Sequence, residues 1–67
     1  MSVARVTEVI ASSKEGWEDA ARQAVTRAAK TLRGITGVEL IRQNAKVENG
    51  RIVEYRVDCR ITFILEK

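Results

Sequence analysis

The chain has 67 residues, with 12 Lys and Arg against 9 Asp and Glu, a net charge of +3, and neither histidine nor proline. The absence of histidine excludes His-based acid–base catalysis and His metal sites, and the single cysteine, Cys59, excludes a disulfide within one chain. No apolar run has the roughly 18–20 residues of a membrane span, and no signal-peptide core is present. We therefore expect one domain over residues 1–67, a cytoplasmic location, and a protein that is not an enzyme.

Residues 3–10 (VARVTEVI) are predicted to form a strand, because they are rich in β-branched residues and contain no Gly or Pro. Apolar residues fall on both sides of this strand: Val3, Ala4, Val6, Val9 and Ile10. Such a pattern is typical of a strand in a sheet that is covered on both faces.

A helix is predicted to follow. Residues 12–15 (SSKE) have the pattern of a capping box, in which the Ser12 hydroxyl and the Glu15 carboxylate accept from free backbone N–H groups; a start at Ser13 fits as well. Gly34 is predicted to end the helix with a left-handed φ. The apolar residues at helical spacing are Trp17, Ala20, Ala21, Ala24, Val25, Ala28, Ala29 and Leu32. The small alanines predict a helix that lies close to a flat sheet.

Asn49-Gly50 predicts a two-residue type I′ hairpin turn, because both positions of this turn need a positive φ. The turn would pair Glu48 with Arg51 and, further along the strands, Glu39 with Arg60, so that two opposite-charge pairs support one register. The same register predicts two apolar pairs, Val38 with Ile61 and Leu40 with Cys59.

This register sorts the hairpin side chains onto two faces. The face predicted to receive the helix carries Val38, Leu40, Val53, Tyr55, Val57, Cys59, Ile61, Phe63 and Leu65. The opposite face carries Glu39, Ile41, Gln43, Ala45, Val47, Ile52, Glu54, Arg56, Asp58, Arg60, Thr62 and Ile64. The predicted fold class is therefore α+β, a β-α-β-β chain with a three-stranded antiparallel sheet and one helix on one face. Because no second helix covers the mixed opposite face, and so small a domain is marginal alone, we expect that face to bind other copies of the chain.

Several segments together carry a family resemblance: residues 6–10 (VTEVI), 12–13 (SS), 17–20 (WEDA), 27–33 (RAAKTLR), 38–39 (VE), 48–51 (ENGR), 54–57 (EYRV) and 63–66 (FILE). At these spacings the chain resembles the dodecin family over nearly its whole length. The resemblance implies a hollow homo-dodecamer with helices outside and sheets inside. It also implies a storage protein that stacks flavin between tryptophans and does not catalyse redox turnover.

The positions that hold flavin in the family are substituted in this chain. The stacking tryptophan corresponds to Gly37 and the glutamine that contacts the flavin edge corresponds to Arg56, while two arginines correspond to Asn44 and Ile64. We therefore predict that the usual flavin stacking is lost, with flavin (FMN or riboflavin) bound in a different pose as the alternative. The pattern without this tryptophan is most similar to the subgroup described as calcium dodecins, which makes Ca²⁺ another ligand to test.

A coenzyme A site is also implied by the resemblance, at Arg27, Thr31 and Arg33, with Arg5 as a fourth residue. Arg27, Lys30 and Arg33 would form a basic strip on the helix, which suits phosphate because guanidinium groups bind it bidentately. The simpler reading, which we favour, is a solvated helix end whose cations complement the helix dipole.

The remaining candidates have simpler structural readings. Glu39, Glu54 and Asp58 offer oxygen ligands for a hard cation, but the neighbouring arginines favour salt bridges. Cys59 is predicted to be a buried and inert thiol, and Trp17 to lie in the core or in a subunit contact. A nucleic-acid-binding module is a lesser alternative, because the charges alternate in sign and the aromatic residues form no stacking platform.

Overall fold

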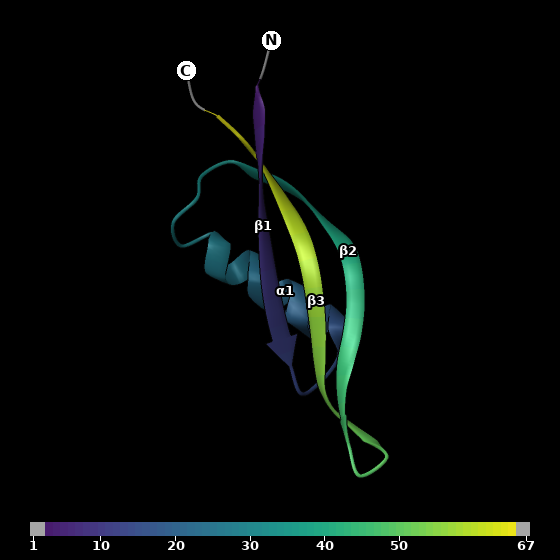
Figure 1. Cartoon of the computed structure of the whole chain (residues 1–67). Helices are drawn as coiled ribbons and strands as arrows, with labels where there is room; N and C mark the ends of the chain where they lie inside the picture. Colours follow the sequence, from purple (N-terminus) through teal and green to yellow (C-terminus); the bar gives the residue numbers. More distant parts are fainter. Residues whose placement is uncertain (1–2, 66–67) are drawn as a thin grey trace.

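The computed structural model describes residues 3–65, so that Glu66, the last residue of the closing motif, lies outside the described residues. The elements are β1 (Ala4–Ser13), α1 (Trp17–Ala28), β2 (Ile35–Glu48) and β3 (Arg51–Ile64). The strands form one antiparallel sheet in the order β1-β3-β2, and α1 lies across one face of it (Figure 1). The predicted β-α-β-β fold is confirmed. No helix within residues 3–65 is long and apolar enough to cross a membrane.

The core lies between α1 and the strands β1 and β3. Ala20 and Ala24 are buried against Val57 and Cys59, and Ile61 is also fully buried. The alanines allow this close approach because their side chains add little thickness between the helix and the sheet. Four residues that were predicted to lie under the helix each have more than a third of their surface exposed: Val38, Leu40, Val53 and Leu65. The helix of 12 residues is too short to cover the 14-residue strands β2 and β3 along their whole length.

The predicted helix start is wrong. Ser12 and Ser13 belong to β1, where they pair with Arg56 and Tyr55, and α1 begins only after Gly16, without a side-chain cap. The Ser13 hydroxyl instead accepts from the backbone N–H of Glu15 over 2.9 Å. Sheet pairing with β3 therefore overrides the local capping signal, because β1 continues along the central strand through Ser13.

The helix also ends earlier than predicted. Its last residue is Ala28, and the N–H groups of Thr31 and Leu32 both donate to the Ala28 carbonyl in the turn that follows. Gly34 has the predicted positive φ, 71°, but it lies beyond this turn. A Cβ at Gly34 would be 3.1 Å from the Ile64 carbonyl oxygen, so glycine is needed where the chain passes close to β3.

The type I′ turn is confirmed by φ values of 53° at Asn49 and 74° at Gly50. The predicted pairs also form: Glu48 with Arg51, Val38 with Ile61, Glu39 with Arg60, and Leu40 with Cys59. Between these ends the prediction is wrong, because the register shifts by one residue between Leu40 and Arg42 and shifts back between Lys46 and Val47.

The shifted segment changes which side chains share a face. Gln43 pairs with Val57 and Ala45 pairs with Tyr55, so both lie on the helix side and not on the predicted opposite face. Asn44 pairs with Arg56 on the face that α1 leaves bare. An alternating pattern cannot reveal such a shift, because one extra residue inverts the side-chain directions that follow it.

Candidate functional site

The side of the sheet that does not contact α1 is called the open face below. It comprises Ala4, Val6, Glu8, Ile10 and Ser12 on β1, Gly37, Glu39, Arg42, Asn44, Lys46 and Glu48 on β2, and Glu54, Arg56, Asp58, Arg60, Thr62 and Ile64 on β3. Two of its aliphatic residues are strongly exposed, Val6 by 51% and Ile10 by 69%. The open face therefore combines bare apolar surface with closely spaced charges, a composition found in protein interfaces.

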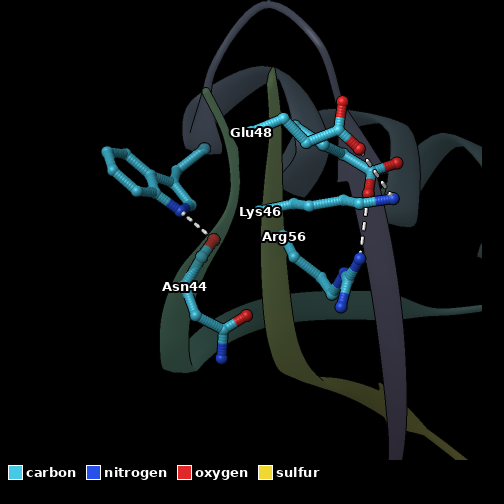
Figure 2. A network of polar contacts seen from close by, with 6 residues as sticks. Asn44, Lys46, Glu48 and Arg56 are labelled. Carbon is cyan, nitrogen blue, oxygen red and sulfur yellow. Dashed lines mark hydrogen bonds and ion pairs between the residues drawn. The ribbon is translucent and has the colours of Figure 1, made fainter. Parts of the chain in front are cut away.

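Ion pairs neutralise part of the open face near the hairpin turn. Arg56 Nη2 lies 2.9 Å from Glu54 Oε1, and Lys46 Nζ lies 3.5 Å from Glu48 Oε2 (Figure 2). Glu54, one of the carboxylates considered as a cation ligand, is thus paired with an arginine. Within residues 3–65 no group of three or more His, Cys, Asp or Glu residues is placed to hold a metal ion.

The four family flavin positions fall into two groups on the open face. Asn44 and Arg56 lie directly opposite each other, whereas Gly37 lies opposite Thr62, two residues from Ile64. Arg56 and Thr62 are six residues apart on β3, which corresponds to about 20 Å. A planar ring could therefore contact both groups only between two protomers.

No aromatic ring lies on the open face among the residues that the structure describes. Trp17 and Tyr55 contact each other on the helix side, with ring centroids 4.8 Å apart at 78°, and Phe63 also alternates onto that side. A Cβ added at Gly37 would meet no atom within 4 Å, so the space for a larger side chain is present. Residues 3–65 thus offer no ring on the open face on which a flavin could stack.

A groove of about 520 Å³ lies between α1 and β1. Its apolar floor includes Val9 and Ala24, and its polar groups include Gln23, Arg27 and Thr31. Arg27 also lines a second hollow of about 370 Å³ on the outer side of α1, together with Lys30. An apolar floor with a guanidinium at its rim suits an amphipathic ligand that carries an anionic group.

The structure brings together only part of the residue set implied for coenzyme A. Arg27 and Thr31 line the groove, whereas Arg5 and Arg33 do not. The predicted helical strip of Arg27, Lys30 and Arg33 is wrong, because α1 ends at Ala28. Gln23 was not predicted from the sequence; it lies one helical turn before Arg27, and this i, i+4 spacing was the available signal.

A second missed residue is Glu8. It pairs with Arg60 on β3 and is a diagonal neighbour of Asp58. The neighbouring Asp58 carboxyl raises the pKa of Glu8, first because it can accept a hydrogen bond from the protonated form of Glu8 and then through its negative charge. Desolvation adds to this effect, while Arg60 and Arg42 oppose it. The sequence could not indicate this pair without the register of β1 against β3, which was not predicted.

Cys59 is fully buried, as predicted. Burial raises the pKa of its thiol, and the charge of Asp58 adds to this effect. The thiolate, which is the nucleophilic form, is therefore disfavoured. This arrangement is that of a structural core thiol.

Comparison with known proteins agrees with this architecture. The family model for Dodecin matches residues 3–66. Calcium dodecin from Mycobacterium tuberculosis is 33% identical over 63 residues, which cover 94% of this chain and 89% of that protein. The structure of dodecin from Streptomyces coelicolor matches with a TM-score of 0.92 and 36% sequence identity, and the match covers 98% of this chain and 94% of that chain. A point variant of the dodecin from Thermus thermophilus has a TM-score of 0.94 at 31% identity over 100% of both chains.

Proposed function

Since the chain belongs to the dodecin family, we propose that it is a non-catalytic protein that forms a hollow homo-dodecamer and holds a small ligand. The observation that carries this proposal is the open face. Val6 and Ile10 are exposed there, and no element within residues 3–65 covers them. Burial of such surface between copies would stabilise a chain whose own core is small.

The size of the core supports association. Within residues 3–65 only five hydrophobic residues are buried, and two of them are alanines: Ala20, Ala24, Val57, Cys59 and Ile61. A domain of this length is marginal without a disulfide, a metal or a partner. The free thiol of Cys59 fits a reducing compartment, so we place the assembly in the cytoplasm.

For the ligand, we propose an amphipathic molecule with a phosphate group, such as coenzyme A, in the groove between α1 and β1. Arg27 would bind the phosphate, Thr31 and Gln23 would contribute hydrogen bonds, and the floor around Val9 would contact apolar atoms. Conventional flavin stacking is not part of the proposal, because the open face lacks an aromatic ring in the described part of the chain.

The assembly is tested by measuring the mass of the wild-type protein with light scattering and native mass spectrometry over a range of dilutions. We expect the wild type to be a dodecamer. The Ile10→Asp variant should form lighter species, because association would bury the charge of the new carboxylate without a partner. Lys14→Asp, outside the open face, serves as the control and should leave the mass distribution unchanged. A wild-type protein that stays a stable single chain would overturn the proposal.

The ligand is tested by isothermal titration of coenzyme A and inorganic phosphate. We expect Arg27→Glu to weaken coenzyme A binding at least tenfold, because a phosphate would then face a carboxylate. Arg51→Glu makes the same charge change at the hairpin turn and should bind as the wild type does. Equal binding by both variants would refute the groove as the site.

A further inference from the structure

Two carboxyl-bearing residues, Glu8 and Asp58, lie on neighbouring strands of the open face. Glu8 pairs with Arg60 and Asp58 pairs with Ile10, which makes Glu8 and Asp58 diagonal neighbours on adjacent strands, about 7–8 Å apart at the backbone. Their side chains are long enough to close that gap. Asp58 Oδ1 is buried and has no hydrogen-bond partner within residues 3–65.

Buried carboxylate oxygens are normally satisfied, so this unpartnered atom requires an explanation. Two ionised carboxylates cannot hydrogen-bond to each other, because neither has a proton to donate. A protonated Glu8 removes the problem, since its hydroxyl can donate to Asp58. The raised pKa of Glu8, caused first by this hydrogen bond and then by repulsion, agrees with that arrangement.

The charges that surround this pair lie on β2 and β3. Arg60 lies beside Asp58 on β3 and opposite Glu8, Arg42 on β2 lies opposite Asp58, and Glu39 on β2 lies opposite Arg60. Both arginines favour the ionised form of Glu8, but their effect is smaller than that of Asp58. The helix contributes no group, because α1 packs on the other face of the sheet.

We infer that Glu8 and Asp58 share one proton on the open face, and that this proton makes the stability of the assembly sensitive to pH. The inference rests on the proposed function, because association is what removes water from the open face. With water excluded, a second negative charge beside Asp58 is more unfavourable than in the free chain. The assembly is therefore more stable with the shared proton than without it.

The direction of the pH effect follows from linkage. The pKa of Glu8 in the folded protein is raised above its ordinary value of 4.5. The stability that the bound proton contributes is therefore complete below pH 4.5 and is lost as pH rises through the raised pKa. A difference of one proton changes the equilibrium by about tenfold per pH unit for each protomer within that window. Acidification from neutral pH should thus tighten the assembly.

The test compares the wild type with Glu8→Gln, Asp58→Asn and the double variant at one protein concentration between pH 4.5 and 8. Both the dodecamer fraction on dilution and the thermal midpoint are measured. Each single variant should become more stable relative to the wild type as pH rises, because each removes the repulsion. The double variant should show no further gain, since one interaction has been removed twice. Glu39→Gln, which leaves the pair intact, should keep the pH dependence of the wild type.

Two failures are distinguishable in this experiment. A wild-type protein that never assembles refutes the proposed function, while its thermal midpoints still compare the variants within the free chain. If the protein assembles but the wild-type and Glu8→Gln curves run parallel, the shared proton is refuted and the assembly stands. If Glu8→Gln does not fold, Asp58→Asn gives the same comparison from the other side of the pair.

Discussion

The indole N–H of Trp17, the first residue of α1, donates a hydrogen bond over 2.9 Å to the backbone carbonyl of Asn44 on β2 (Figure 2). Asn44 lies in the segment of β2 whose register is shifted, and the same shift places Ala45 opposite Tyr55, the ring that Trp17 contacts edge-on. The start of the helix is thus attached to the irregular part of the hairpin. The side chain of Asn44 meanwhile lies on the open face, opposite Arg56.

This attachment predicts the effect of Trp17→Phe. The variant keeps an aromatic ring beside Tyr55 but loses the hydrogen bond to Asn44, which should lower the free energy of unfolding by about 1 kcal/mol. For a domain of this size the thermal midpoint should fall by about 4–8 °C. The measurement is thermal unfolding at fixed protein concentration. Tyr55→Phe, the control, removes a hydroxyl and keeps the ring contact with Trp17. An equally large fall in the thermal midpoint of this control would contradict the role given to the indole N–H.

The packing of α1 on the sheet predicts a strong effect at Ala20. This residue is fully buried, so Ala20→Leu must push the helix away from the sheet, with a destabilisation of about 1–3 kcal/mol. Ala29→Leu adds the same side chain at an exposed position just after the helix. It should change the denaturant midpoint little, and comparable losses in the two variants would argue against the close approach.

Asp19 predicts a loss of stability in acid. Its carboxylate accepts hydrogen bonds of 2.6 Å from both Ser13 and Gln23, and these bonds lower its pKa below the ordinary value of 3.8. Its contribution to stability is therefore complete above pH 3.8 and is lost as pH falls through the lowered value.

Asp19→Asn should accordingly be less stable than the wild type at pH 7, and the difference should shrink below pH 3.8. Thermal midpoints measured from pH 2 to pH 7 give this difference directly. Glu15→Gln is the matched control, because only the backbone N–H of Glu15 makes a described hydrogen bond. The difference in thermal midpoint between this variant and the wild type should not shrink in the same way below pH 3.8. A gap for Asp19→Asn that stays constant with pH would exclude the two hydrogen bonds as its cause.

The room in front of Gly37 predicts a gain of flavin binding. Gly37 does not have a positive φ, and an added Cβ meets no atom within 4 Å, so Gly37→Trp should be tolerated and place an indole on the open face. Riboflavin fluorescence should then be quenched more strongly by the variant than by the wild type, because an aromatic face offers stacking. Val38→Trp, which alternates to the helix side, is the control. Strong quenching by the wild type itself would show that flavin binds without this ring.

Sequence alone determined the parts of this protein that depend on local chemistry. Asn49 and Gly50 specify the hairpin turn because both adopt positive φ, and the ends of the hairpin register follow from it. The spacing of Ala20 and Ala24 determined which side of the helix faces the sheet. These signals involve neighbouring residues, so the order β-α-β-β and the bare face of the sheet could be predicted.

Tertiary structure decided what depends on distant partners. Pairing of Ser13 with Tyr55 extends β1 and delays the helix, although the residues around Ser13 resemble a cap. The register shift places Asn44 opposite Arg56, and the Asn44 carbonyl accepts a hydrogen bond from Trp17, 27 residues away in the chain. Glu8 and Asp58 likewise become neighbours only when β1 docks beside β3. Such contacts are set by packing between strands that are far apart in sequence, and no local pattern records them.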